Sequence, residues 1–257
     1  MSQSRHSIEV IAHRGFSGMF PENTLAAFRG AIDCGADRVE LDVLLTRDSV
    51  PVVIHDALLD RTTGAHGAVC DRSLEEIRRL DAGSWFHQRF AGERIPTLDE
   101  ALALLGPRIP VNVEIKEEAV VPRPPRDDGV EARVVAALRR HGLVSTATVS
   151  SFELLAVERV HRLCPEVQCE LLFNDSSRPP SESDLELAAR AGFCGLNVSR
   201  EELRVNSSIV AAALRRGLRV KVYTIDDPEE LSDLLELGVA GVFTNRPDLL
   251  LPLARSL

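Results

Sequence analysis

Short apolar runs alternate with helical stretches along almost the whole chain, and this alternation constrains the fold more than any other feature. Each apolar run has the length of one strand, and most are followed by a segment of helical periodicity, several of which end in Gly or Pro. Such an alternation predicts a parallel sheet built from repeated strand–helix units. The predicted strands span 8–14, 38–45, 50–55, 109–116, 146–151, 167–173, 193–198, 218–224 and 240–244.

One connection departs from this rhythm. The residues between 45 and 50, LTRDSV, are too few for a crossover helix and suit a hairpin turn. We therefore expect 50–55 to run antiparallel to 38–45, with residue 42 opposite about 54. The eight other strands in 257 residues match the size of an α/β protein of the (β/α)8 TIM-barrel type, made slightly irregular by the return strand. A doubly wound open sheet has the same alternation and is the alternative.

The segment after the strand that ends at His55 does not fit the repeat. Residues 57–96 contain many turn formers, the only Trp and one predicted short helix over 73–80. Insertions of this length in compact domains are commonly functional. We therefore expect residues 1–257 to form a single barrel domain whose insertion covers the active-site end.

Composition excludes several classes of partner. A net charge of −9 disfavours a nucleic-acid partner, because phosphate backbones are bound by basic surfaces. The five cysteines are odd in number and form no CxxC motif, so they indicate neither a disulfide framework nor a zinc site. No apolar run approaches the roughly 18 residues of a membrane span, and the first residues lack the apolar segment of a signal peptide. We therefore expect a cytoplasmic protein without membrane insertion.

Carboxylates occupy one face of two predicted strands. In RVELDVLL, Glu40 and Asp42 share the face opposite an aliphatic one, and in VNVEIK, Glu114 and Lys116 do the same. The aliphatic faces of a barrel lie under the helices, which directs these polar side chains into the barrel mouth. Buried carboxylates are costly unless they are neutralised, so three that converge imply a cation. An all-oxygen set favours Mg²⁺ or Ca²⁺ over zinc, whereas either motif alone is typical of a solvated strand face or a surface ion pair.

Two histidines and two cations join this predicted site. His13 ends the first strand, and the hairpin register brings His55 within a residue of Asp42. Imidazoles titrate near neutral pH and can act as general acid and general base. Arg14 and Lys116 supply positive charge that suits a phosphate group. These residues predict metal-assisted cleavage of a phosphoester.

The same motifs resemble one family. AHRG, PENT, VELDV, VVIHD and VEIK, then the insertion LDRTTGAHGAV and the later SSF, VYTIDD and GVFTNRPDLL, resemble the glycerophosphodiester phosphodiesterases in order and spacing from Ile11 to Leu250. The resemblance implies hydrolysis of a small-molecule glycerophosphodiester, such as glycerophosphocholine or glycerophosphoethanolamine, to sn-glycerol 3-phosphate and an alcohol. It implies that His13 and His55 are the acid–base pair. It implies that one divalent metal ion, Mg²⁺ or Ca²⁺, is bound by Glu40, Asp42 and Glu114. It also implies that the phosphate is bound by Arg14 and Lys116.

The resemblance also implies that the insertion closes over the glycerol end of the substrate, with Trp85, Phe86 or nearby residues in that pocket. The chain departs from the family in having Tyr223 where Trp is frequent, Asp226 where Asn is common and Asn245 where Asp is frequent. Two other functions remain: a lysophospholipase D-type activity on longer-chain lysophospholipids, and a barrel that binds phosphate without catalysis. The nucleophile, water or the glycerol 2-hydroxyl, and the division of roles between the two histidines stay open at this point.

Overall fold

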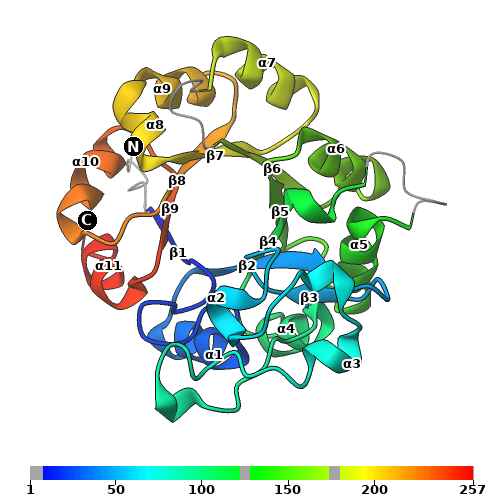
Figure 1. The fold of residues 1–257 in the computed structure, drawn as a ribbon. Coiled ribbons are helices and arrows are strands. Elements are labelled where there is room, and N and C mark those ends of the chain that lie inside the picture. The colour runs from blue at the N-terminus through cyan, green and yellow to red at the C-terminus, as the bar shows by residue number, and fades with distance from the viewer. Residues whose placement is uncertain (1–7, 122–127, 174–179, 257) are drawn as a thin grey trace.

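Eight parallel strands form a closed ring with helices around it (Figure 1), because β1 pairs with both β9 and β2. The computed structural model describes residues 8–121, 128–173 and 180–256. Ring closure confirms the TIM barrel and rules out the open sheet. The strands are β1 (Glu9–Ala12), β2 (Arg38–Leu45), β3 (Pro51–Val53), β4 (Val111–Ile115), β5 (Thr148–Ser151), β6 (Gln168–Phe173), β7 (Gly195–Ser199), β8 (Arg219–Tyr223) and β9 (Gly241–Thr244).

The ninth strand is the predicted hairpin return. β3 runs antiparallel to β2 with Val43 opposite Val53, which is the predicted register. The strand is shorter than predicted, since it ends at Val53, and β1 likewise ends at Ala12. His13 and His55 therefore lie in the turns just beyond their strands, where a side chain is free to face the barrel mouth.

Helices cover the outside of the ring (Figure 1). The aliphatic faces of the strands lie beneath them, and Val39, Leu41 and Val43 of β2 are fully buried there. The larger helices are α1 (Leu25–Cys34), α4 (Leu98–Leu105), α5 (Val130–Arg140), α6 (Leu154–Leu163), α7 (Glu182–Arg190), α8 (Arg200–Val205), α9 (Ser208–Leu214), α10 (Leu231–Glu236) and α11 (Pro247–Ala254). Within the described ranges, no helix combines the length and the apolar character needed to cross a membrane.

The insertion contains more helical turns than its sequence predicted. The one predicted helix is present in shorter form as α3 (Leu74–Ile77), begun by a capping box from Ser73. Three further short elements accompany it: α2 (Asp60–Thr63), η1 (Val69–Asp71) and η2 (Gln88–Phe90). Elements of three or four residues are too short to show a helical period, so the sequence pattern missed them. In Figure 1, α2 and α3 are drawn on the same side of the ring as β3 and α4.

Candidate active site

A cavity of about 1000 Å³ opens where the parallel strands end. Six of the seven predicted site residues line it, and the seventh, Asp42, is buried next to it. Part of the cavity lining, contributed by β6, β8, α7 and the residue after β5, is apolar. Its residues, which we call the apolar wall, are Phe152, Leu171, Leu172, Phe173, Leu187 and Tyr223. The strand ends thus bring together an acidic centre, two histidines, two cations and an apolar surface.

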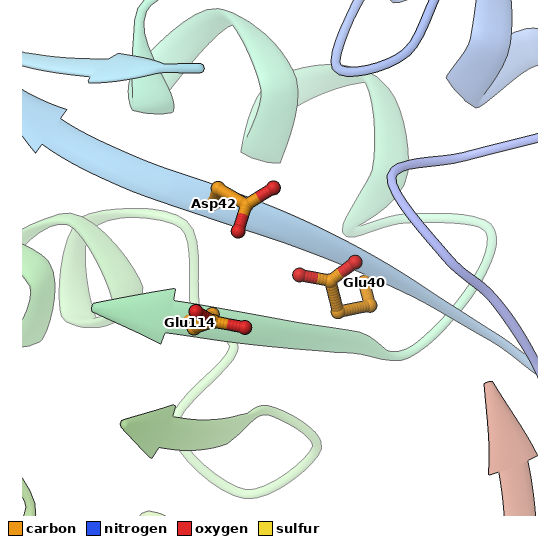
Figure 2. A group of neighbouring side chains, drawn as sticks. All are labelled: Glu40, Asp42 and Glu114. Carbon is orange, nitrogen blue, oxygen red and sulfur yellow. The ribbon is translucent and has the colours of Figure 1, made fainter. Parts of the chain in front are cut away.

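Glu40, Asp42 and Glu114 form a carboxylate cluster. Figure 2 shows Glu40 and Asp42 on β2 beside Glu114 on β4, and one oxygen from each lies within 4.8 Å of the others. The sheet register explains the convergence, because Asp42 and Glu114 are direct partners across the two strands. All three are buried. The prediction from strand alternation alone therefore placed these carboxylates on the correct face.

The carboxylate cluster carries more negative charge than its surroundings neutralise. Burial, then the charges of Asp42 and Glu114, raise the pKa of Glu40 well above its usual range. Burial and Asp42 likewise raise the pKa of Glu114 to about 7. Glu40 Oε2 accepts the Arg14 backbone N–H at 2.7 Å, but Oε1 is buried without a hydrogen-bond partner among the described residues. An unpartnered oxygen in an all-carboxylate cluster fits a hard divalent cation.

Asp42 is the best neutralised member of the cluster. Burial would raise its pKa, but Arg14 and Lys116 outweigh burial and lower it. Arg14 Nε lies 3.5 Å from Asp42 Oδ2, and Lys116 Nζ lies 3.6 Å from Oδ1. Lys116 Nζ also donates to Glu114 Oε1 at 2.7 Å. The side-chain amide of Asn23 donates to Asp42 Oδ2 at 2.7 Å, which fixes the carboxylate.

The backbone of Arg14 takes an unusual conformation. Its φ of +56° lies in the left-handed region, and Gly15 follows at +79°. A Cβ on Gly15 would lie 2.8 Å from the backbone of Ala27, so only glycine fits there. A left-handed non-glycine residue is costly and is found chiefly at functional sites. Here it directs the Arg14 N–H to Glu40.

His13 is held by a neutral amide. Its Nδ1 lies 2.9 Å from Asn245 Oδ1, while Asn245 Nδ2 donates to Asp226 Oδ2 at 2.8 Å. Because the Asp226 carboxylate only accepts, the amide orientation is set and Nδ1 of His13 must donate. Burial and the charge of Arg14 lower the pKa of His13 to about 4. The ring is therefore neutral at neutral pH, with its lone pair on Nε2.

His55 is held by a carboxylate. Its Nδ1 lies 2.6 Å from Asp56 Oδ1. A hydrogen bond from Arg61 lowers the pKa of Asp56 to about 2, so the carboxylate is ionised and Nδ1 of His55 donates to it. Such a partner fixes the orientation of the ring and leaves Nε2 for chemistry.

The structure adds contacts that the sequence patterns did not reveal. Thr24 caps α1, whereas the side chain of its neighbour Asn23 binds Asp42. Of the described residues in the insertion, Ala57 and Leu58 line the cavity, and the expected Trp85 and Phe86 do not. The Trp85 ring instead lies 5.8 Å from the guanidinium of Arg61. These contacts join residues that are distant in sequence, and no local spacing signals them.

Together, the closed parallel barrel and this site define an enzyme of the phosphodiester hydrolase class. The model of the glycerophosphoryl diester phosphodiesterase family matches residues 13–249, and the chain belongs to that family. It is therefore a phosphoric diester hydrolase, as its sequence motifs predicted.

Relatives and solved structures agree with this assignment. The chain is 37% identical over 247 residues to a glycerophosphodiester phosphodiesterase of Caldanaerobacter subterraneus, covering 96% of this chain and 97% of the relative. It is 32% identical over 256 residues to a glycerophosphodiester phosphodiesterase of Bacillus subtilis, covering 94% of this chain and 85% of the relative. An Oleispira antarctica phosphodiesterase, solved in complex with the product sn-glycerol-3-phosphate, superposes with a TM-score of 0.86 at 30% identity over 98% of both chains.

Proposed function

We propose that this enzyme hydrolyses glycerophosphodiesters such as glycerophosphocholine to sn-glycerol 3-phosphate and an alcohol, with a divalent metal ion and two histidines. The observation that carries the proposal is the placement of His13 and His55 in one cavity with the carboxylate cluster and two cations. The product bound to the Oleispira antarctica phosphodiesterase supports the choice of substrate.

One Mg²⁺ or Ca²⁺ is the proposed occupant of the carboxylate cluster. Three carboxylates, of which Glu40 offers an unpartnered oxygen, supply the hard ligands that these ions prefer. When bound, the ion polarises the phosphate and offsets its developing negative charge. The pKa values of Glu40 and Glu114 are raised because their ionised forms are buried beside other carboxylates. A bound cation supplies the positive charge that these ionised forms need.

Arg14 and Lys116 are the proposed phosphate-binding pair. Both line the cavity, and both already contact the carboxylate cluster. Their charges orient a diester whose non-bridging oxygens carry negative charge, and they stabilise the extra charge of the transition state.

The surroundings of the two histidines divide the acid–base roles. His13 is neutral with its lone pair on Nε2, so it takes the proton of the nucleophile. Nδ1 of His55 is held by the carboxylate of Asp56, which leaves its Nε2 to donate a proton to the departing alkoxide. The proton that His13 takes comes from water or from the 2-hydroxyl of the glycerol group. The second route passes through a cyclic phosphate, which ³¹P NMR distinguishes from direct hydrolysis.

A second candidate is lysophospholipase D-type cleavage of longer-chain lysophospholipids. The apolar wall favours it, because this surface lines the same cavity as the two histidines and offers apolar contact to an acyl chain. Purified protein incubated with glycerophosphocholine and, separately, with lysophosphatidylcholine separates the two by choline release. The proposal expects metal-dependent release chiefly from glycerophosphocholine, and preferential release from the lysophospholipid would replace it with the second candidate. Release from neither, with phosphate still bound, would indicate a barrel that has lost catalysis.

A further inference from the structure

Arg61 of the insertion binds two carboxylates at once. From α2, its guanidinium donates to Asp56 through Nε at 2.6 Å and Nη2 at 3.1 Å. It donates to Glu22 through Nη1 at 2.8 Å and Nη2 at 2.7 Å. Both carboxylates are therefore held in bidentate fashion, the geometry that a planar guanidinium provides and a lysine does not.

Each of these carboxylates contacts a residue of the proposed site. Asp56 accepts from Nδ1 of His55 at 2.6 Å, and Glu22 accepts from Nη1 of Arg14 at 2.9 Å. One side chain thus connects the proposed general acid to the proposed phosphate ligand. The two carboxylates come from different segments of the chain, since Glu22 precedes β2 and Asp56 follows β3.

We propose that Arg61 is a positioning residue, which fixes His55 through Asp56 and Arg14 through Glu22 and thereby makes the geometry of the reaction depend on the insertion. This inference rests on the proposed function, because it assumes that His55 and Arg14 act on the substrate. Arg61 itself does not line the cavity.

The insertion holds Arg61 from its other side. The Trp85 ring lies 5.8 Å from the Arg61 guanidinium, within the range of a cation–π contact. Trp85 is itself fixed by a hydrogen bond from its Nε1 to the Ala82 carbonyl at 2.9 Å. The hydrogen bonds that Arg61 donates to Glu22 and Asp56 also raise its pKa, as expected for a cation between two carboxylates. These contacts explain how a side chain that is 43% exposed can keep one position.

The test compares Arg61→Ala and Arg61→Lys with Arg79→Ala as a matched control. Arg79 is an exposed arginine of the same insertion that pairs only with Glu75 among the described residues. With glycerophosphocholine and metal present, Arg61→Ala is expected to lower kcat about 10- to 100-fold, as losses of supporting hydrogen bonds commonly do. The kcat of Arg61→Lys is expected to fall nearly as far, and the kcat of Arg79→Ala is expected to equal that of the wild type. Added guanidinium ion is expected to restore part of the activity of Arg61→Ala and none in Arg61→Lys.

A measurement without turnover keeps this inference separate from the proposed function. In ¹⁵N NMR, with the His55 signal assigned from a His55→Gln variant, the wild type and Arg79→Ala are expected to show Nδ1 of His55 protonated. Arg61→Ala is expected to show a mixture of the two tautomers. If the wild type does not cleave glycerophosphocholine but this tautomer shift occurs, the proposed function fails and the positioning by Arg61 stands. If the tautomer and kcat of Arg61→Ala both equal those of the wild type, the inference is overturned.

Discussion

Asn245 Oδ1 lies 2.9 Å from Nδ1 of His13, so a neutral amide, not a carboxylate, holds the proposed general base. Asp226 sets the direction of that amide by accepting from its Nδ2 at 2.8 Å and from its backbone N–H at 2.7 Å. Asn245 therefore lies between the negative charge of Asp226 and the imidazole ring of His13. Burial and the charge of Arg14 keep His13 uncharged, and the amide at its Nδ1 adds no negative charge, whereas Nδ1 of His55 contacts the charge of Asp56 directly.

Exchanging the two residues in the double variant Asp226→Asn/Asn245→Asp should raise the pKa of His13. The exchange preserves the pattern of donors and acceptors but places the carboxylate on Nδ1, where it stabilises the protonated ring. An opposite charge at hydrogen-bond distance typically moves a pKa by one unit or more. NMR titration of the His13 ring, starting from about 4 in the wild type, measures the change. A pKa that does not rise would show that Asn245 does not control the charge of His13.

The two histidine variants should respond differently to the leaving group. His55→Ala removes the proposed acid, so it should lose 10²-fold or more with glycerophosphocholine and recover much of this with a p-nitrophenyl diester, whose leaving group needs no proton. His13→Ala removes the proposed base and should be impaired on both substrates. Steady-state rates on the two substrates check this, and recovery by His13→Ala in place of His55→Ala would reverse the assignment.

Removing one member of the carboxylate cluster should weaken metal binding and lower activity with it. Glu40→Gln, Asp42→Asn and Glu114→Gln each delete a charged ligand, and we expect at least a tenfold to hundredfold loss of Mg²⁺ or Ca²⁺ affinity by calorimetry. The control is Glu153→Gln, because Glu153 follows β5 at the same end of the barrel but lies outside the cluster. Affinity that is unchanged in all three variants would contradict the proposed metal site.

The raised pKa of Glu114 predicts how stability depends on pH in the presence of a chelator. Between its ordinary value of 4.5 and about 7, the folded protein keeps a proton that the unfolded chain has released. The free energy of unfolding should therefore fall as pH rises through this window, by roughly 3 kcal/mol from this group.

The lowered pKa of His13 acts in the opposite direction between about 4 and 6.5. Glu114→Gln retains His13, so the difference in denaturant stability between the wild type and this variant isolates Glu114. Adding Mg²⁺ or Ca²⁺ should stabilise the wild type more at pH 8 than at pH 5, because the ion binds ionised carboxylates. A wild type that gains stability over the variant as pH rises in chelator would refute the sign of this effect.

The barrel and the carboxylate cluster were accessible from sequence because strand alternation has a fixed period. Once Val39, Leu41 and Val43 are assigned to the helix side, Glu40 and Asp42 must face the barrel interior. The hairpin register followed from turn length, and β3 confirms it. Such features depend only on residues that are close in the chain.

The supporting contacts were not accessible because they join distant segments. Asn245 reaches His13 across 232 positions, and Arg61 reaches Glu22 across 39. The short helices of the insertion are too short to show a period, and α3 is marked only by its cap, Ser73. The family resemblance implied Trp85, Phe86 or nearby residues in the glycerol pocket, yet Trp85 does not line the cavity and packs on Arg61.

The most direct test of the central claim is ³¹P NMR of glycerophosphocholine incubated with the purified protein, once with Mg²⁺ or Ca²⁺ and once with excess chelator. We predict that sn-glycerol 3-phosphate appears with the metal ion, either directly or after a cyclic phosphate, and that its formation stops in chelator. Phosphocholine as the product, or a rate that chelator leaves unchanged, would contradict the account.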